Sequence, residues 1–254
     1  MRTIRSKWVK TKVLLAKASL SAYVPNTKRL TRDNLRQMLE RYRMVYVKPD
    51  GGTGGNGVMR VEQRAGSYSY QIGTRRRVFA TYPALYKSLI TMTRGKAYLA
   101  QKGIELMKCS GRRFDLRIMV QINSAGRWET TGIVARLAAP KKIVTNYHNG
   151  GTPVSTDWLF GRIMPDAQRT ALFAKLKALG VATGVCMGKR FPGVNEVGVD
   201  VGLDGSRKPW IIEVNTRPDL YIFNQLKDKR MFRKMWGYAK KLGRFKRRKS
   251  TAGQ

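Results

Sequence analysis

The sequence is poor in the residues that build disulfide frameworks and most metal centres. Among its 254 residues are two cysteines, Cys109 and Cys186, and one histidine, His148. Two cysteines so far apart indicate no disulfide framework and fit a reducing compartment. Together with a single histidine they cannot supply the four ligands of a structural zinc site.

Acidic residues are scarce as well. The chain has 15 Asp and Glu against 51 Lys and Arg, and its formal net charge is +36. A surface of this sign attracts anions, so nucleic acid, an anionic membrane or wall polymer, and an acidic substrate are all candidate partners. The alternative is a compositional bias of the source organism. The basic residues are spread along most of the chain, and only residues 244–249 form a dense run, which predicts a disordered basic tail over 243–254.

Long apolar runs are also lacking. Residues 1–20 contain no apolar core long enough for a signal peptide, because Lys17 interrupts the best run. We find no uninterrupted apolar stretch of the length that a membrane span needs, which predicts no transmembrane segment. These features favour a cytoplasmic protein. The apolar content of 42% is ordinary for a globular chain that buries a sizeable core in one or two domains.

The most distinctive stretch is residues 44–61, MVYVKPDGGTGGNGVMRV. Residues 44–47 are apolar and β-prone and predict a buried strand, and residues 58–61 predict a second strand. Lys48 ends the first strand, and a glycine-rich loop follows it. Backbone N–H groups in such a loop can approach an anion closely because no Cβ intervenes, and the lysine adds a compact positive charge. The stretch therefore predicts a polyphosphate site.

Three better-known glycine motifs fit this loop less well. The spacing of Gly52, Gly54 and Gly57 matches a dinucleotide fingerprint, but that fingerprint requires a helix directly after the loop. A Walker A loop would end in Gly-Lys-Ser/Thr, and a kinase would carry its lysine on a later strand, with His-Arg-Asp and Asp-Phe-Gly motifs. The sequence contains none of these. The remaining alternative is a flexible hairpin without a ligand.

The rest of the chain predicts mixed helices and antiparallel strands, an α+β fold. Thr31 is a good N-cap for a helix that continues to residue 42. A helix that opens at Pro165 is expected to end at Gly180, and one helix is expected over 220–242. The strand pattern of 114–122 alternates, with Phe114, Leu116, Ile118 and Val120 on one face and Asp115, Arg117, Met119 and Gln121 on the other. The other expected elements are strands at 67–71, 77–80, 97–101, 128–137, 196–203 and 210–214 and a helix at 82–93.

Three polar residues late in the chain share one face of a predicted hairpin. Glu213 and Asn215 are two apart in a strand, so their side chains project together. If the hairpin turns near Ser206, Asp200 lies opposite Glu213 with the Cβ atoms about 5 Å apart. Two carboxylates and an amide oxygen suit a magnesium ion that bridges to phosphate. The alternative is that each carboxylate pairs with one of the many basic residues.

Two arginines, Arg117 and Arg136, lie on the two middle predicted strands. We expect both guanidinium groups to be available for planar, bidentate contact with phosphate. In a chain this basic, an ordinary basic sheet surface is the alternative.

This order of motifs resembles the ATP-grasp superfamily: a lysine-rooted glycine loop, a Gln-x-Gly-Ile joint, arginine-bearing middle strands and a late Asp…Glu-x-Asn. Other segments resemble the YheC/YheD-type proteins, which are ATP-grasp proteins associated with the spore coat of endospore-forming bacteria. The resemblance covers residues 1–242. The segments that carry it are SKWVK at 6–10, YVPNTKRLTRDNLRQML at 23–39, VYVKPDGGTGGNGV at 45–58, FDLRIMVQ at 114–121, NYHNGG at 146–151 and IIEVNTRPD at 211–219.

The resemblance implies an ATP-grasp fold, in which two α+β subdomains with mainly antiparallel sheets, residues 1–97 and 98–242, clasp ATP between them. Lys48 would contact the phosphates and the loop would close over them. The Lys102 carbonyl and the Ile104 N–H would meet adenine. The implied ATP-binding residues are Lys48, Gly51, Gly52, Thr53, Gly54, Gly55 and Gly57, with Gln101, Lys102, Gly103 and Ile104 at the hinge. The implied Mg²⁺ ligands are Asp200, Glu213 and Asn215, and the implied catalytic residues are Arg117 and Arg136.

The activity implied is that of an ATP- and magnesium-dependent ligase, which joins a carboxylate to an amine or thiol through an acyl phosphate. Few residues precede the loop strand, so we expect no separate substrate-binding domain before the grasp. One alternative is a non-catalytic protein of this fold that binds an anionic polymer, such as a spore coat or wall component. A nucleic-acid binder is another alternative, but it rests on charge alone.

Overall fold

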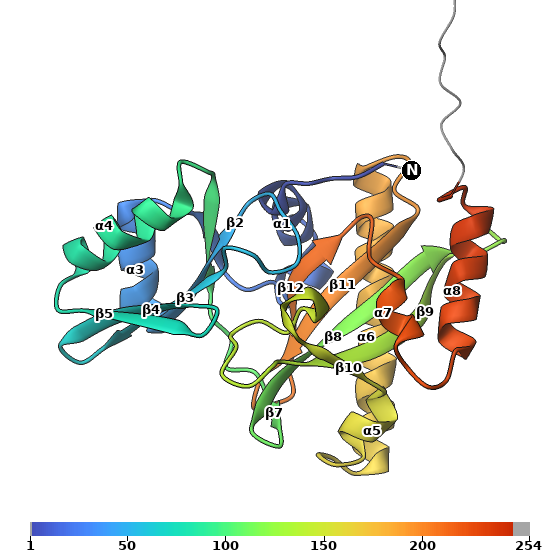
Figure 1. Ribbon diagram of the computed structural model, residues 1–254. Helices are drawn as coiled ribbons and strands as arrows, with labels where there is room; N and C mark the ends of the chain where they lie inside the picture. The colour runs from blue at the N-terminus through green and yellow to red at the C-terminus, as the bar shows by residue number, and fades with distance from the viewer. Residues whose placement is uncertain (1, 246–254) are drawn as a thin grey trace, which may run out of the picture.

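The computed structural model describes residues 2–245 and contains two antiparallel sheets flanked by helices (Figure 1). This architecture confirms the predicted α+β class. In the first sheet the strands run in the order β1 (Thr27–Arg29), β6 (Tyr98–Lys102), β2 (Met44–Pro49), β3 (Met59–Arg64), β4 (Ser67–Ile72) and β5 (Arg75–Phe79). In the second the order is β10 (Thr152–Val154), β9 (Trp128–Leu137), β8 (Arg112–Ile122), β11 (Glu196–Leu203) and β12 (Pro209–Asn215), and the short β7 (Lys108–Cys109) pairs with β8.

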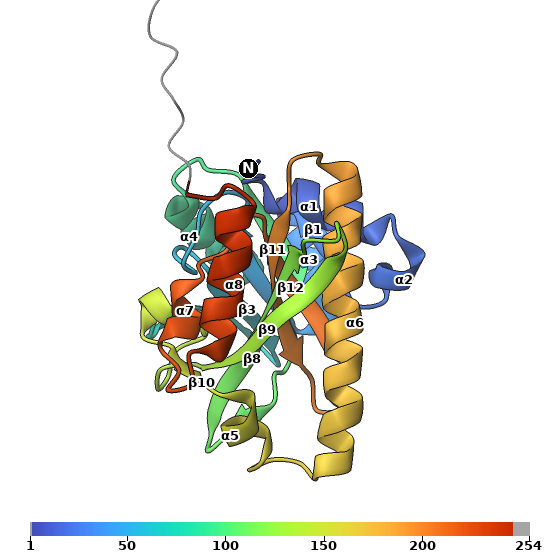
Figure 2. The ribbon, with the colours of Figure 1, turned by 90° about the vertical axis from the view of Figure 1, so that its right-hand side faces the viewer.

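Helices cover one face of the first sheet and both faces of the second. On the first sheet, α3 (Arg32–Tyr42) and α4 (Tyr82–Thr93) bury their leucines against the strands. On the second, α6 (Asp166–Arg190) covers one face, while α7 (Tyr221–Asn224) and α8 (Arg230–Lys241) cover the other (Figure 2). The remaining helices are α1 (Lys7–Leu15), α2 (Ala18–Ser21), α5 (Thr156–Phe160) and the 3-10 turn η1 (Tyr147–Asn149).

Local capping explains where the helices of the first sheet begin. The Thr31 hydroxyl accepts a hydrogen bond from Asn34 N, and the Thr81 hydroxyl accepts one from Ala84 N. Each satisfies an amide that the first turn of a helix leaves without a partner. The predicted N-cap at Thr31 is therefore confirmed.

The predicted end of α6 at Gly180 is wrong, because the helix continues to Arg190. Its glycines recur every four residues and so lie on one face of the helix. A Cβ added to Gly180 would lie 2.9 Å from Ile118 Cγ2, and one added to Gly184 would lie 2.5 Å from the Trp128 ring. These glycines therefore allow the helix to approach the sheet closely and do not end it.

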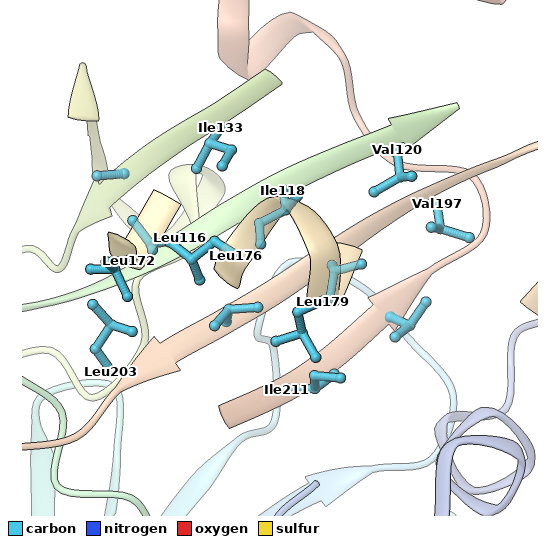
Figure 3. Packing of buried hydrophobic residues seen from close by; sticks show 14 of the residues in the cluster. Leu116, Ile118, Val120, Ile133, Leu172, Leu176, Leu179, Val197, Leu203 and Ile211 are labelled. Atoms are coloured by element: carbon cyan, nitrogen blue, oxygen red, sulfur yellow. The ribbon is translucent and has the colours of Figure 1, made fainter. Parts of the chain in front are cut away.

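The same helix corrects the expectation that no long apolar segment exists. By length and composition α6 could cross a membrane, since an 18-residue window has a mean hydropathy of 1.4. In the structure its Leu172, Leu176 and Leu179 pack against Leu116 and Ile118 of β8 (Figure 3). Packing of this kind is what a core helix of a globular domain shows.

The predicted alternation of side chains along β8 is confirmed, but the strand is buried on both faces. Phe114, Leu116, Ile118 and Val120 belong to the core under α6, while Met119 packs with α7 and α8 on the other face. Asp115 and Arg117 share that second face, nearer the first sheet, and are also buried. The strand thus holds charged side chains where the two sheets approach each other.

The two ends of the described chain differ from expectation. Residues 220–242 form two helices, and Asp228 accepts a hydrogen bond from Arg230 N where the second begins. Arg244 forms an ion pair with Glu196, so the start of the predicted basic tail packs against the protein, and residues 246–254 lie outside the described residues. The division into subdomains at residues 97 and 98 remains a prediction, and strand pairing places β6 in the first sheet.

Candidate functional site

A cavity of about 100 Å³ opens between the two sheets. Tyr46 and Lys48 from β2 and Gln101 from β6 line it on one side. The second sheet contributes acidic and basic side chains from four strands on the other side. An apolar part is formed by Tyr46, Val58, Ile104, Leu106, Ile143 and Ile212. The cavity therefore combines an apolar slot with a charged end, which is the usual composition of a site for a small polar ligand.

Lys48 lies in this cavity and is only 6% exposed. Its Nζ donates hydrogen bonds to Gln101 Oε1 at 2.8 Å and to the Ile212 carbonyl at 2.9 Å. An ammonium group has three donors, so one remains for a ligand. Burial lowers the pKa of Lys48 to about 8, an effect that Glu213 partly offsets. Near neutral pH the group is thus charged and ready to receive an anion.

The predicted hinge residues join the two sheets beside Lys48. Gln101 donates from Nε2 to Thr27 Oγ1 at 3.0 Å, which fixes the orientation of its amide. Gly103 N donates to the Met44 carbonyl, and a Cβ at Gly103 would lie 2.9 Å from that oxygen, so only glycine fits. Among residues 2–245, the Ile104 N–H has no hydrogen-bond partner. It therefore remains available to a ligand in the apolar part of the cavity.

The glycine loop between β2 and β3 needs its glycines for their backbone conformation. Gly52, Gly54, Gly55 and Gly57 all have positive φ angles, between 72° and 100°. Side chains other than hydrogen are disfavoured there. A Cβ on Gly55 would also lie 2.5 Å from Asn146 Oδ1. The loop is therefore specified as a bare backbone surface, as an anion site requires.

Contacts from both sides hold this loop over the cavity. Lys7 Nζ in α1 donates to the Gly52 carbonyl at 2.9 Å, and Asn149 Nδ2 in η1 donates to the Gly54 carbonyl. Asp50, at the start of the loop, accepts hydrogen bonds from Ser6 Oγ and Trp8 N, at the beginning of α1. The N-terminal helix and the loop at 146–151 are thus part of the site.

The predicted hairpin geometry is confirmed, because Asp200 in β11 pairs in register with Glu213 in β12. The same Asp200 faces Arg117 in β8. Asn215 Nδ2 lies 3.5 Å from Asp200 Oδ2. The three proposed metal ligands therefore occupy one face of the sheet at the mouth of the cavity.

The arginines are engaged with carboxylates, so the expectation of free guanidinium groups is wrong. Arg117 holds Asp200 through Nε at 2.5 Å and Nη2 at 3.1 Å. Arg136 pairs with Asp115 through two hydrogen bonds and with Asp200 at 3.1 Å. All four side chains are almost completely buried. The alternative of carboxylates paired with basic residues therefore holds for Asp200 in this structure.

These pairs set the charge states of the network. Burial by itself raises the pKa of Asp200, but the guanidinium groups of Arg117 and Arg136 bring it below its ordinary value overall. Burial by itself lowers the pKa of Arg136, but Asp115 and Asp200 together have the larger effect and bring it above its ordinary value overall. Arg136 and Asp200 are therefore ionised at neutral pH.

The donor set fits a hard divalent cation. Glu213 is less engaged than Asp200, with Lys7 Nζ at 3.6 Å, and it lines the cavity. Within residues 2–245 no group of three Asp, Glu, His or Cys side chains is placed to hold a metal ion. The predicted set has two carboxylates, and its third donor is the amide of Asn215. Carboxylate and amide oxygens suit magnesium. Ligation by Asp200 would require one of its arginine contacts to open.

Sequence reasoning missed two lysines of α1, Lys7 and Lys10. Both are buried, 7% and 5% exposed, and their three-residue spacing places them on one face of the helix, beside β12. Their three-residue spacing was the available signal, but only the docking of α1 beside the glycine loop brings them into the site.

A second cavity, of about 290 Å³, adjoins the first at the same carboxylates. It shares Arg136, Asp200 and Glu213 with the first cavity. The loop at 146–151 and the segment after β12 form its outer wall, with Tyr147, His148, Arg217 and Asp219. The site is therefore two connected chambers with the charged network between them.

Residues 2–242 match the family described as YheC/D-like ATP-grasp. The chain belongs to this family. Two curated relatives come from Bacillus subtilis (strain 168). The endospore coat-associated protein YheD is 27% identical over 190 residues, which are 72% of this chain and 41% of the relative. The endospore coat-associated protein YheC is 22% identical over 222 residues, 85% of this chain and 61% of the relative. The chain thus spans about half the length of these relatives.

The fold itself is confirmed by a solved structure, the crystal structure of D-cycloserine synthetase DcsG. It superimposes with a TM-score of 0.56, covering 93% of this ATP-grasp chain and 70% of the other, at 14% sequence identity. At that identity the likeness shows the ATP-grasp fold and leaves the substrate to be inferred from the site.

Proposed function

We propose that this YheC/D-like protein is an ATP- and magnesium-dependent ligase that joins a carboxylate to an amine or thiol through an acyl phosphate. One observation carries the proposal: Lys48 and the row formed by Asp200 and Glu213 meet in one cavity between the two sheets. Burying charge is costly, so the buried ammonium of Lys48 and the buried carboxylate of Asp200 favour a retained role in nucleotide chemistry.

In this proposal the adenine occupies the apolar part of the first cavity. The Ile104 N–H and the Lys102 carbonyl meet its polar edge, and Ile212 packs against its ring. The phosphates then lie at Lys48, under the loop that Lys7 ties down at Gly52. Positive φ glycines in that loop present N–H groups to the phosphate oxygens.

Asp200, Glu213 and Asn215 would hold the magnesium, which supplies charge neutralisation at the phosphate oxygens. Glu213 is the side chain best placed to do so, since its nearest charged partner is 3.6 Å away. Arg117 and Arg136 are held by Asp200 and Asp115 at the border of the two chambers. From there they position positive charge where the transferred phosphoryl group would pass.

Replacing Lys48 by alanine should weaken binding of a non-hydrolysable ATP analogue. Loss of one charge-assisted hydrogen bond costs about 1.5–3 kcal/mol, or about 10- to 150-fold in affinity. Because the pKa of Lys48 is lowered to about 8, wild-type affinity should also fall as the pH rises above that value, and the variant should lack this fall. Calorimetry at several pH values measures both effects.

Lys87→Ala is the matched control for this experiment, because Lys87 is an exposed lysine on α4. It should bind the analogue like the wild type. Equal affinity of the wild type and Lys48→Ala for the analogue would show that the nucleotide does not bind in this cavity.

A polyanionic partner is a second proposal, and the observation that favours it is the charge of +36 displayed on exposed elements. Arg75, Arg76 and Arg77 of β5 are all exposed. Folding gains nothing from such an excess, since like charges oppose compaction. We propose an acidic polymer of the spore coat or wall, or nucleic acid, as the partner, either beside the ligase activity or, in a non-catalytic protein, in its place.

Binding to heparin, poly-glutamate or DNA should weaken steeply between about 50 and 200 mM salt, because several counterions are released together. Binding of the ATP analogue should change much less, since directional hydrogen bonds contribute to it. A salt titration of both ligands on one preparation measures the difference. If none of the three polymers binds even at low salt, the polyanion proposal is wrong.

A further inference from the structure

A third cavity, of about 370 Å³, lies between the N-terminal segment and the end of β12. It shares Thr53 of the glycine loop, Glu213 and Asn215 of β12, and Arg217 with the second cavity. With the nucleotide cavity between the sheets it shares only Glu213. The hydrogen bond from Ile4 N to Thr216 Oγ1, at 2.8 Å, joins its two remaining walls. It is therefore distinct from the nucleotide cavity and adjoins the second cavity at the proposed metal ligands.

Lys10 is the unexplained side chain of this chamber. It is 5% exposed and lines the cavity, yet in the described part of the chain its ammonium group has no hydrogen-bond or ion-pair partner. Lys7 and Lys48 are buried to the same degree, but each has partners. The side chain is thus largely buried while its unpaired ammonium faces the cavity, where a bound anion would supply the partner that the protein does not.

The other charged groups of the chamber point to the sign of that ligand. Arg5 and Arg217 stand at its exposed rim, and neither forms an ion pair with residues 2–245. The single carboxylate that faces the cavity is Glu213, whose charge a magnesium ion would take up. Lys10, Arg5 and Arg217 thus surround a space whose single carboxylate is assigned to the metal. The hydroxyls of Thr53 and Thr216 add hydrogen-bond donors.

We propose that this chamber binds a second anionic group of the acid substrate, a carboxylate or a phosphate, with Lys10 as its buried anchor. The inference rests on the ligase function proposed above. It makes the substrate a polyanionic acid: one carboxylate is activated at the magnesium, and the other oxyanion is held by Lys10, Arg5 and Arg217. Burial also lowers the pKa of Lys10, to which Lys7 contributes and which Glu213 opposes, and a bound oxyanion would reverse this effect.

The test compares the wild type with Lys10→Met, which keeps the length and apolar stem of the side chain and removes its charge. Lys12→Met is the control, because Lys12 is an exposed lysine on the same helix. Succinate and inorganic phosphate serve as probes, titrated by calorimetry with magnesium and a saturating ATP analogue present. We expect Lys10→Met to weaken binding of the preferred probe about tenfold or more, and Lys12→Met to leave it unchanged. Preference for succinate or for phosphate identifies the anionic group.

Thermal unfolding distinguishes this role from a structural one. Without a probe, Lys10→Met should unfold at the wild-type temperature or above it, because it removes an unpaired charge from a largely buried side chain. A variant that unfolds at a clearly lower temperature would show that Lys10 supports the fold, against the proposal. Equal probe binding by the wild type and Lys10→Met, or no binding by either, would also overturn it.

Affinity for the ATP analogue, measured on the same preparations, separates this inference from the function on which it rests. We expect that affinity to be unchanged in Lys12→Met and to change much less than probe binding does in Lys10→Met. A loss in Lys10→Met as large as its loss of probe binding would assign the chamber to a nucleotide phosphate and overturn the proposal. If the analogue fails to bind the wild type, the ligase function is wrong.

Discussion

Replacing Glu213 by glutamine should nearly abolish magnesium-dependent ATP turnover and leave the fold intact. Glutamine has the same shape but no negative charge, and a hard divalent cation depends on charged oxygen ligands. The structure predicts little cost in stability, because the one ion pair of Glu213, with Lys7, is long at 3.6 Å. The same change should remove the gain in affinity for an ATP analogue that magnesium confers on the wild type.

Glu40→Gln is the matched control, since Glu40 is exposed on α3 and remote from the cavities. ADP release during a magnesium titration and calorimetry with the analogue give two independent readings. Turnover of Glu213→Gln at the wild-type rate would refute the metal-site assignment.

Replacing Arg136 by methionine should destabilise the protein by about 3–5 kcal/mol, the cost of breaking a buried pair from one side. The change leaves Asp115 without its partner and Asp200 with Arg117 alone, all within a nearly dry part of the sheet. Denaturant unfolding at neutral pH measures the loss. Arg77→Met, at an exposed position of β5, is the control and should change the free energy of unfolding by less than about 0.5 kcal/mol.

The pH dependence gives a second reading of the same network. The pKa of Asp200 is lowered in the folded protein, so its contribution is present above the unfolded pKa and is lost as the pH falls through the folded one. The difference in stability between the wild type and Arg136→Met should therefore shrink in acid. A loss at neutral pH no greater than that of Arg77→Met would show that the arginine pairs contribute little.

The strand periodicity predicted the part of the site that depends on local geometry. Alternation in β8 and the two-residue spacing in β12 fix which side chains share a face, and a hairpin fixes that Asp200 meets Glu213. The ion pairs of Arg117 and Arg136 depend instead on the register of strands far apart in sequence. One-residue shifts in that register would send these side chains to opposite faces, so the sequence left the pairing open.

Tertiary packing explains the other differences. Gly180 has the local features of a helix end. In the structure it lies inside α6, where the lack of a side chain allows close contact with Ile118. Lys7 and Lys10 lie in a basic N-terminal segment, and only the docking of α1 beside the glycine loop shows their place in the site. Docking of this kind decides burial, and burial distinguishes a site lysine from a surface lysine.

The central claim is ATP-dependent activation of a carboxylate, and hydroxylamine trapping tests it most directly. In the proposed reaction a substrate carboxylate oxygen attacks the γ-phosphorus of ATP, and ADP leaves as the acyl phosphate forms. Hydroxylamine then displaces phosphate and leaves an acyl hydroxamate. The protein is incubated with ATP, magnesium, hydroxylamine and a panel of mono- and polycarboxylic acids, while ADP and hydroxamate are measured together.

We predict that at least one acid, polyanionic by the inference above, raises ADP release and yields hydroxamate in equal amount, and that Glu213→Gln yields neither. The contrary result is that the wild type binds the ATP analogue but no acid increases its ADP release. That result would contradict the ligase function and favour a non-catalytic nucleotide-binding protein.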